Sequence, residues 1–239
     1  MKKVHQVLIV LGVLLLGCSK EQYNKTPASS IEIRIDHSVD GQELTMDKIM
    51  YSHPGGYAYS VTKLKYYLSD IKLIKSGGSV SVSKFIYIDA LNPETYLFHL
   101  PENSSFNAIE FTFGLYEQIN HHDSLPLTNE NLKMIWPDEM GGGYHFMKLE
   151  GHYAPGNDAE KGYTMHLGAN NFQFKVRLNT AFTLNNSRKQ LVLNMNINEW
   201  FKNPVLYDFE KDGNYSMGIP ENMKLLQNNG QTVFSIKSN

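Results

Sequence analysis

The stretch Phe172-Gln173-Phe174-Lys175-Val176-Arg177-Leu178 decides the fold, because apolar and polar residues alternate strictly along it. Successive side chains of a β-strand point to opposite faces of the sheet, so this alternation predicts a strand buried on one face. The same pattern predicts further strands over 31–35, 70–73, 111–113 and 191–197. The continuously apolar Phe85-Ile86-Tyr87-Ile88 predicts a strand buried on both faces.

Turn signals separate these stretches at regular intervals. Gly, Pro and Asn gather at 76–79, 92–93, 101–103, 185–186 and 228–230, and such clusters are typical of loops between strands. We therefore predict an all-β fold, an antiparallel β-sandwich or barrel-like domain. Helix signals are few: a short helix over 128–134 capped by Thr128, and a brief turn over 198–201. A loop-rich insertion is expected near 117–143.

The first seventeen residues have the pattern of a cleaved leader. Lys2 and Lys3 precede an apolar run from Val7 to Leu16. A membrane-spanning helix needs about 20 apolar residues, so this short run indicates a signal peptide. The leader ends in Leu15-Leu16-Gly17-Cys18, which resembles the lipobox of bacterial lipoproteins.

Cys18 is the single cysteine of the chain, and its position predicts lipidation. Two or more acyl chains on such a cysteine give stable membrane anchoring. Ser19 follows it rather than Asp, which favours the outer membrane within the cell envelope. We expect a signal peptide over 1–17, a lipidated tether over 18–30 and one β domain over 31–239.

Size and charge limit the function classes. Cleavage would leave 239 − 17 = 222 residues, which fits one all-β domain. The leader holds two of the 22 basic residues and none of the 24 acidic ones, so the mature charge is about 20 − 24 = −4. There is no basic tract, and this argues against a nucleic-acid partner.

Histidine and methionine gather in one region of the chain. Five of the nine histidines and four of the ten methionines lie between 121 and 166, and Trp136 lies among them. Imidazole and thioether together suit copper, Cu(I) in particular. The candidate ligands are His121, His122, Met140, His145, His152 and His166.

The spacing of these residues alone does not define a site. On a regular strand His145 and His152, seven residues apart, would point to opposite faces, although Gly151 could break the strand and turn His152. The alternative interpretation is that the histidines are hydrogen-bonded core or edge residues and the methionines fill gaps in the core.

Five motifs, in order, resemble the MbnP family of periplasmic copper-binding proteins, the methanobactin partner proteins. They are Tyr66-Tyr67-Leu68-Ser69-Asp70-Ile71-Lys72-Leu73, Ile109-Glu110-Phe111-Thr112-Phe113-Gly114-Leu115 followed by Asn120, Met134-Ile135-Trp136 with the block 143–151, Met165-His166-Leu167-Gly168, and 191–201. The resemblance covers residues 30–205. It implies a β-sandwich-like protein that binds copper through histidines, with Trp136 as the candidate for oxidation to kynurenine by a di-haem partner related to cytochrome c peroxidases.

The sequence departs from the family pattern after Trp136. Asp138 stands where many relatives have a second tryptophan, and residues 137–142 lengthen the approach to Gly143. This departure weakens the expectation of a modified tryptophan and adds Asp138, Glu139 and Met140 as nearby donors. Gly141, Gly142 and Gly143 are expected to allow positive φ values in a tight loop before the strand.

Two functions from different classes follow. The first is a copper-binding lipoprotein of the cell envelope that stores, delivers or handles Cu(I) or Cu(II). We expect no enzymatic activity, because the sequence has no Gly-x-Ser-x-Gly motif of an α/β-hydrolase and its single cysteine is assigned to the lipid. The second is a metal-free binding module that holds a glycan, a peptide or a partner lipoprotein through exposed aromatics. Its candidates are Tyr57, Tyr59, Tyr144 and Tyr153.

Overall fold

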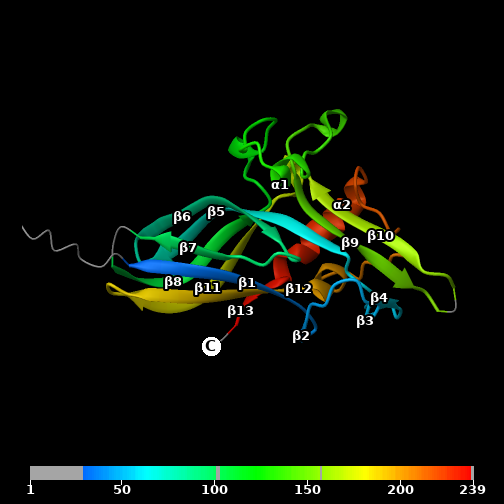
Figure 1. Ribbon diagram of the computed structural model, residues 1–239, viewed down its shortest axis with the longest axis horizontal. Coiled ribbons are helices and arrows are strands. Elements are labelled where there is room, and N and C mark those ends of the chain that lie inside the picture. Colours follow the sequence, from blue (N-terminus) through cyan, green and yellow to red (C-terminus); the bar gives the residue numbers. More distant parts are fainter. Residues whose placement is uncertain (1–28, 101–102, 157, 238–239) are drawn as a thin grey trace, which may run out of the picture.

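The strands of the protein form two sheets that face each other across one core (Figure 1). The computed structural model describes residues 29–100, 103–156 and 158–237. In the first sheet the order is β13 (Phe234–Ile236), β12 (Arg188–Asn196), β1 (Ser30–Val39) and β2 (Gln42–Glu43), and β7 (Thr95–His99) also pairs with β1.

The second sheet is larger and carries the candidate site. Its order is β11 (Phe174–Leu184), β8 (Ser104–Phe113), β5 (Lys63–Lys75), β9 (His145–Ala154), β4 (Ala58–Tyr59) and β3 (Tyr51–Ser52), with β6 (Gly78–Asp89) on β5 and β10 (Lys161–Gly168) on β9. One edge of β5 serves two neighbours: residues 63–66 pair with β9, and residues 68–74 pair with β8. The long strand β5 therefore holds the β9–β10 hairpin in the sheet.

The core lies between the sheets and confirms the all-β prediction. In β1 the odd-numbered Ile31, Ile33 and Ile35 are buried, as period-two alternation requires. Aromatic rings from the larger sheet pack against the smaller sheet from the other side: Phe111 and Phe113 contact Phe234 of β13. One pairing differs from the expectation, because β1 runs parallel to β12. Parallel neighbours need a long crossover, and about 150 residues of chain separate these two strands.

Short helices lie in the connections. The insertion near 117–143 is confirmed and contains η1 (Glu117–Ile119), α1 (Asn129–Leu132) and η2 (Asp138–Met140). The predicted cap is confirmed too, because the Thr128 side chain accepts a hydrogen bond from the Asn131 N–H. The predicted turn at 198–201 is η4 (Ile197–Phe201), and η5 (Gly230–Thr232) follows later. The insertion lies beside the start of β9 and the end of β10 (Figure 1).

One helix was not expected from the sequence. Helix α2 (Pro220–Asn229) begins with Pro220 in its first turn, a common helix start. Its apolar stripe is short: Met223 and Leu226 are buried, and the remaining buried positions are Asn or Gln. The Asn228-Asn229-Gly230 sequence, predicted as an inter-strand turn, is instead the end of this helix. No helix in the described part of the chain is long and apolar enough to cross a membrane.

Four local predictions need correction. Phe172 lies in η3 (Asn170–Phe172) and Ile197 in η4, so the strands there are shorter than the alternation suggested. Phe85 and Tyr87 are only half-buried, so β6 is fully buried on one face only. The predicted tether ends early, because Ser29 is buried, accepts a hydrogen bond from Leu100 N and precedes β1 directly.

Candidate metal site

A β-bulge brings two of the candidate histidines together. The β9–β10 pairing runs regularly until Leu167 opposite Met147, and then the register shifts so that Gly168 lies opposite His145. A bulge re-aims side chains next to it. Strict alternation would leave His145 on the face of Met147, whereas His166 pairs with Lys148 and lies on the other face. At the bulge the His145 ring nevertheless meets the His166 ring edge to face, with centroids 5.1 Å apart and planes at 84°.

His145 is a buried, neutral imidazole. Its backbone N–H and its ring Nδ1 both lie within hydrogen-bond distance of the Met134 carbonyl oxygen, at 2.6 and 3.2 Å. Donation from Nδ1 places the lone pair on Nε2. Burial, with the nearby Lys148 and His166, lowers the pKa of His145 to about 3. The ring therefore stays unprotonated at ordinary pH, as a metal ligand must.

His166 has two ring nitrogens in contrasting surroundings. Nε2 lies 2.9 Å from Oε1 of Glu150, while Nδ1 is buried and has no hydrogen-bond partner. The other Glu150 oxygen accepts from Lys63 Nζ at 2.6 Å. The hydrogen bond from His166, followed by that from Lys63, lowers the pKa of Glu150 to about 2 despite partial burial. The site thus contains one buried imidazole nitrogen, Nδ1 of His166, without a hydrogen-bond partner.

Trp136 forms one wall of the site. The insertion returns to the sheet here, because Trp136 N donates to Gly143 O at 2.9 Å and the 134–136 segment bridges to the start of β9. The indole centroid lies 4.7 Å from that of His145, and its N–H donates to the Met140 carbonyl oxygen at 3.1 Å. The ring packs so closely on Gly168 that a Cβ there would lie 2.3 Å from Cε3.

The glycine run before β9 behaves as predicted. Gly141, Gly142 and Gly143 have φ values of 101°, 67° and 85°, a region that favours glycine. At Gly143 an added Cβ would also lie 2.6 Å from the Asn120 side-chain oxygen. That Asn120 oxygen accepts from Tyr144 N, and its amide donates to Asn170 at 2.7 Å. Asn120 therefore ties the insertion to the residue before β9 and to η3, which follows β10, a role that sequence reasoning did not assign.

The structure leaves the other candidate histidines outside this pair. His152 is exposed and lies seven residues beyond His145 on β9, about 23 Å away at roughly 3.3 Å per residue. The prediction that Gly151 could break β9 is wrong, because the strand continues through it to Ala154. Gly151 instead allows the Ser60 backbone to approach closely: a Cβ added at residue 151 would lie 2.0 Å from the Ser60 carbonyl oxygen.

The insertion presents the remaining candidates to solvent. His121 and His122 are exposed, and His122 Nδ1 lies 3.8 Å from Oδ1 of Asp138, which is itself exposed. The Met140 side chain is 41% exposed, whereas the three other methionines of the cluster, Met134, Met147 and Met165, are core residues with no exposure. Within residues 29–100, 103–156 and 158–237, no three His, Cys, Asp or Glu side chains form a metal-binding group.

The exposed-aromatic hypothesis is wrong for most of its residues. Tyr59, Tyr144 and Tyr153 are at most 4% exposed, and only Tyr57 is half-buried. These rings pack into the protein rather than facing a ligand; Tyr57, for example, meets Tyr153 at 5.2 Å. The sequence gives the positions of these tyrosine residues, but it does not show which elements cover their side chains.

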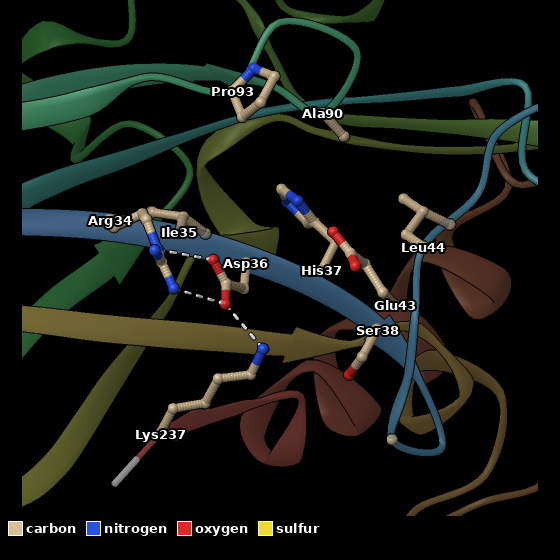
Figure 2. A pocket seen from close by; sticks show the side chains of 11 residues that line it. Arg34, Ile35, Asp36, His37, Ser38, Glu43, Leu44, Ala90, Pro93 and Lys237 are labelled. Carbon is tan, nitrogen blue, oxygen red and sulfur yellow. Dashed lines mark hydrogen bonds and ion pairs between the residues drawn. The ribbon is translucent and has the colours of Figure 1, made fainter. Parts of the chain in front are cut away.

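Two further buried histidines were missed by the sequence analysis. His53 packs among aromatic rings, and His37 bonds Tyr66 through Nε2 at 2.9 Å. His37 borders a pocket of about 460 Å³ between β1, the β2 turn and the 90–93 loop (Figure 2). Arg34 and Lys237 both pair with Asp36 at its rim (Figure 2). No residue of the His145–His166 site lines this pocket.

Comparison with known proteins identifies the family. The MbnP family model matches residues 28–219. The chain belongs to the MbnP family. Among solved structures, MbnP from Methylosinus trichosporium is similar, with a TM-score of 0.54, 14% identity, and coverage of 74% of this chain and 78% of that one. At this identity the likeness shows a shared fold. No curated protein matches the chain.

The MbnP match includes every residue of the site. Asn120, Trp136, His145, Glu150 and His166 all lie within 28–219, whereas α2 begins just after it, at Pro220. Membership relates the chain to methanobactin-associated, copper-related proteins. The strands that build the site thus belong to the part of the chain that defines the family.

Proposed function

We propose that this MbnP protein binds copper as Cu(I) between His145 and His166 and stores, delivers or handles it in the cell envelope. The observation that carries the proposal is the buried Nδ1 of His166, which has no hydrogen-bond partner. A buried polar atom left unpaired costs about 1–3 kcal/mol. A metal ion bound at this nitrogen, with the neutral His145 ring 5.1 Å away centroid to centroid, would remove that cost.

The donor set fits a soft monovalent ion better than a hard or divalent one. Structural zinc sites take four protein ligands, and the described residues contain no group of three His, Cys, Asp or Glu. Glu150 is already bonded to His166 and Lys63. Burial first and then the Lys148 cation lower the pKa of His145. The same cation repels a metal ion nearby, and this repulsion grows with the charge of the ion. Imidazole is a suitable ligand for copper.

Trp136 remains the candidate for oxidation to kynurenine by a di-haem partner. Its position against His145 supports this part of the proposal, because a modified side chain would lie beside the metal. We propose binding and no catalytic step for this pair; the Ser216 hydroxyl bonds the backbone of His166. Intact mass of protein from cells with and without the partner tests the modification.

Anchoring through Cys18 belongs to the same proposal. The leader and Cys18 lie outside the described residues, and β1 begins at Ser30, 30 − 18 = 12 residues later. Twelve extended residues span at most about 40 Å, so the β domain would stay close to the membrane. Release of the protein from the membrane fraction in a Cys18→Ala variant tests the anchor, and an unchanged membrane fraction would contradict it.

The copper proposal is tested by metal content. Residues 19–239, purified without a histidine tag, would be loaded with Cu(I) and desalted exhaustively. We expect about one copper per chain, lost in His145→Ala and in His166→Ala. His152→Ala and His121→Ala are matched controls that should keep the metal. Absence of copper from folded wild-type protein would overturn the proposal and leave the family resemblance as one of fold.

A further inference from the structure

The two ring nitrogens of His166 have different hydrogen-bonding options. Nε2 faces a carboxylate oxygen of Glu150 at 2.9 Å. An ionised carboxylate only accepts hydrogen bonds, so Nε2 must carry the proton. In a neutral imidazole the lone pair then belongs to Nδ1, the nitrogen that is buried without a partner.

Glu150 is itself held in place by the sheet. It lies opposite Lys63 of β5 on one side and opposite Thr164 of β10 on the other. Lys63 Nζ bonds Oε2 at 2.6 Å, which leaves Oε1 for the histidine. His166 is two residues beyond Thr164, and such diagonal neighbours on one face of a sheet are within reach of long side chains. The carboxylate is thus fixed by strand register and by an ion pair.

The backbone of His166 is also fixed. Ser216 Oγ accepts from His166 N and donates to His166 O, both at 2.7 Å. Ser216 N bonds Thr164 O in turn, so the 214–216 segment runs along the free edge of β10. With the backbone held on one side and Nε2 on the other, the imidazole ring has little freedom to flip.

We infer that Glu150 is a positioning residue: it keeps the proton of His166 on Nε2, so that copper binds at Nδ1. This inference rests on the proposed copper function. A carboxylate behind a ligating histidine sets its tautomer, orients its ring and raises its basicity. Glu150 would then act on the metal through His166 without touching it.

The tautomer is measurable without metal. Long-range ¹⁵N–¹H correlation spectra of residues 19–239 should show His166 protonated at Nε2. In Glu150→Ala the Nδ1–H form should become populated, and Glu150→Gln, whose amide oxygen can accept the same bond, should restore the Nε2–H form. Glu110→Ala is the matched control, because Glu110 of β8 pairs with Arg177 of β11, away from β9 and β10 in the same sheet. A wild-type His166 protonated at Nδ1, or an unchanged tautomer in Glu150→Ala, would overturn the inference.

Copper affinity provides the second measurement. Glu150→Ala should weaken Cu(I) binding by about 10–100-fold, whereas Glu110→Ala should not change it. Lys63→Met removes the ion pair but keeps the acceptor, and should cost less than about fivefold. Equal Cu(I) affinity in wild type and in a folded Glu150→Ala variant would overturn the positioning role of Glu150 but not the proposed copper binding. Absence of copper from the wild type would overturn the proposed function, while the metal-free spectra would still decide whether Glu150 sets the tautomer.

Discussion

His53 and His166 share an unusual feature, and they use it in opposite ways. Each buries one ring nitrogen without a hydrogen-bond partner, Nε2 in His53 and Nδ1 in His166. In His53 the other nitrogen accepts from Gly55 N at 2.9 Å, so the unpartnered atom carries the proton. In His166 the other nitrogen donates to Glu150, so the unpartnered atom carries the lone pair.

The surroundings match this difference. His53 stacks on Tyr57 at 4.5 Å and meets Phe209 at 4.4 Å, and an N–H can make a weak contact with an aromatic face. His166 meets a second imidazole, that of His145, whose Nδ1 lies 3.2 Å from the Met134 carbonyl oxygen. Burial alone therefore does not identify a ligand; the partner of the second nitrogen decides whether a buried histidine packs or binds.

The largest expected effect separates the two histidines directly. His166→Ala should abolish copper retention, a loss of at least about 100-fold in affinity, and His53→Ala should retain the metal. Removing the His53 ring from its aromatic cluster should lower the free energy of unfolding by about 3 kcal/mol, as large-to-small core changes do. Copper analysis and urea unfolding of both variants provide the measurements. Loss of copper in a folded His53→Ala would break the comparison.

The second prediction concerns pH. Burial lowers the pKa of His53 to about 4, with Asp208 opposing the shift, so between about pH 6.5 and 4 the unfolded chain binds a proton that the folded chain does not. Stability therefore falls as pH falls through this window, by about 1.4 kcal/mol per unit. From pH 7 to pH 5 we expect His53 to contribute a loss of about 2 kcal/mol, measured by urea unfolding.

The variant His53→Phe should remove the part of the pH dependence of stability that comes from His53. An identical slope in wild type and His53→Phe would show that the buried ring is not the titrating group.

The third prediction concerns the tryptophan wall. Gly168→Ala would place a Cβ 2.3 Å from the Trp136 ring. Overpacking costs about 1–3 kcal/mol, and the stiffer unfolded chain offsets part of it, so a net loss of about 1–2 kcal/mol is expected, with a change in tryptophan fluorescence. Gly162→Ala in the same strand is the matched control, since its nearest neighbour lies at 3.9 Å. Equal stability of the two variants would contradict the close packing.

The smallest effect is expected at Met140. Its side chain is 41% exposed, and its link to the site is the backbone oxygen that accepts from Trp136. Met140→Leu should therefore change stability by less than about 0.5 kcal/mol and copper affinity by less than about threefold. A large loss of copper affinity would make the thioether a ligand and change the proposed donor set.

Several features were accessible from the sequence because they depend on local chemistry. Alternation in β11 and β12 predicted the sheets, Thr128 predicted the start of α1, and three successive glycines predicted the left-handed loop at 141–143. Helix α2 was missed because its buried face is largely amide side chains, which lack the apolar period that marks a helix.

The site itself was only partly predictable. Clustering of histidines pointed to the right region, but it did not separate His145 and His166 from the exposed His121, His122 and His152. The MbnP motifs contain Trp136, His145 and His166, but they do not show that the two histidine rings meet. Glu150 carried no signal of its own, since a single carboxylate in an alternating strand usually faces solvent. Its role depends on the neighbours that pairing supplies.

By itself the sequence determined which residues are apolar, where the chain turns and which side chains are able to bind a soft metal, because these properties belong to single residues and their near neighbours. The tertiary structure alone decided which of those side chains meet. The bulge at His145 is a shift in register between two strands, and the proton on His166 is set by a carboxylate sixteen residues away in the chain. Both depend on strand pairing, which one-dimensional periodicity does not encode.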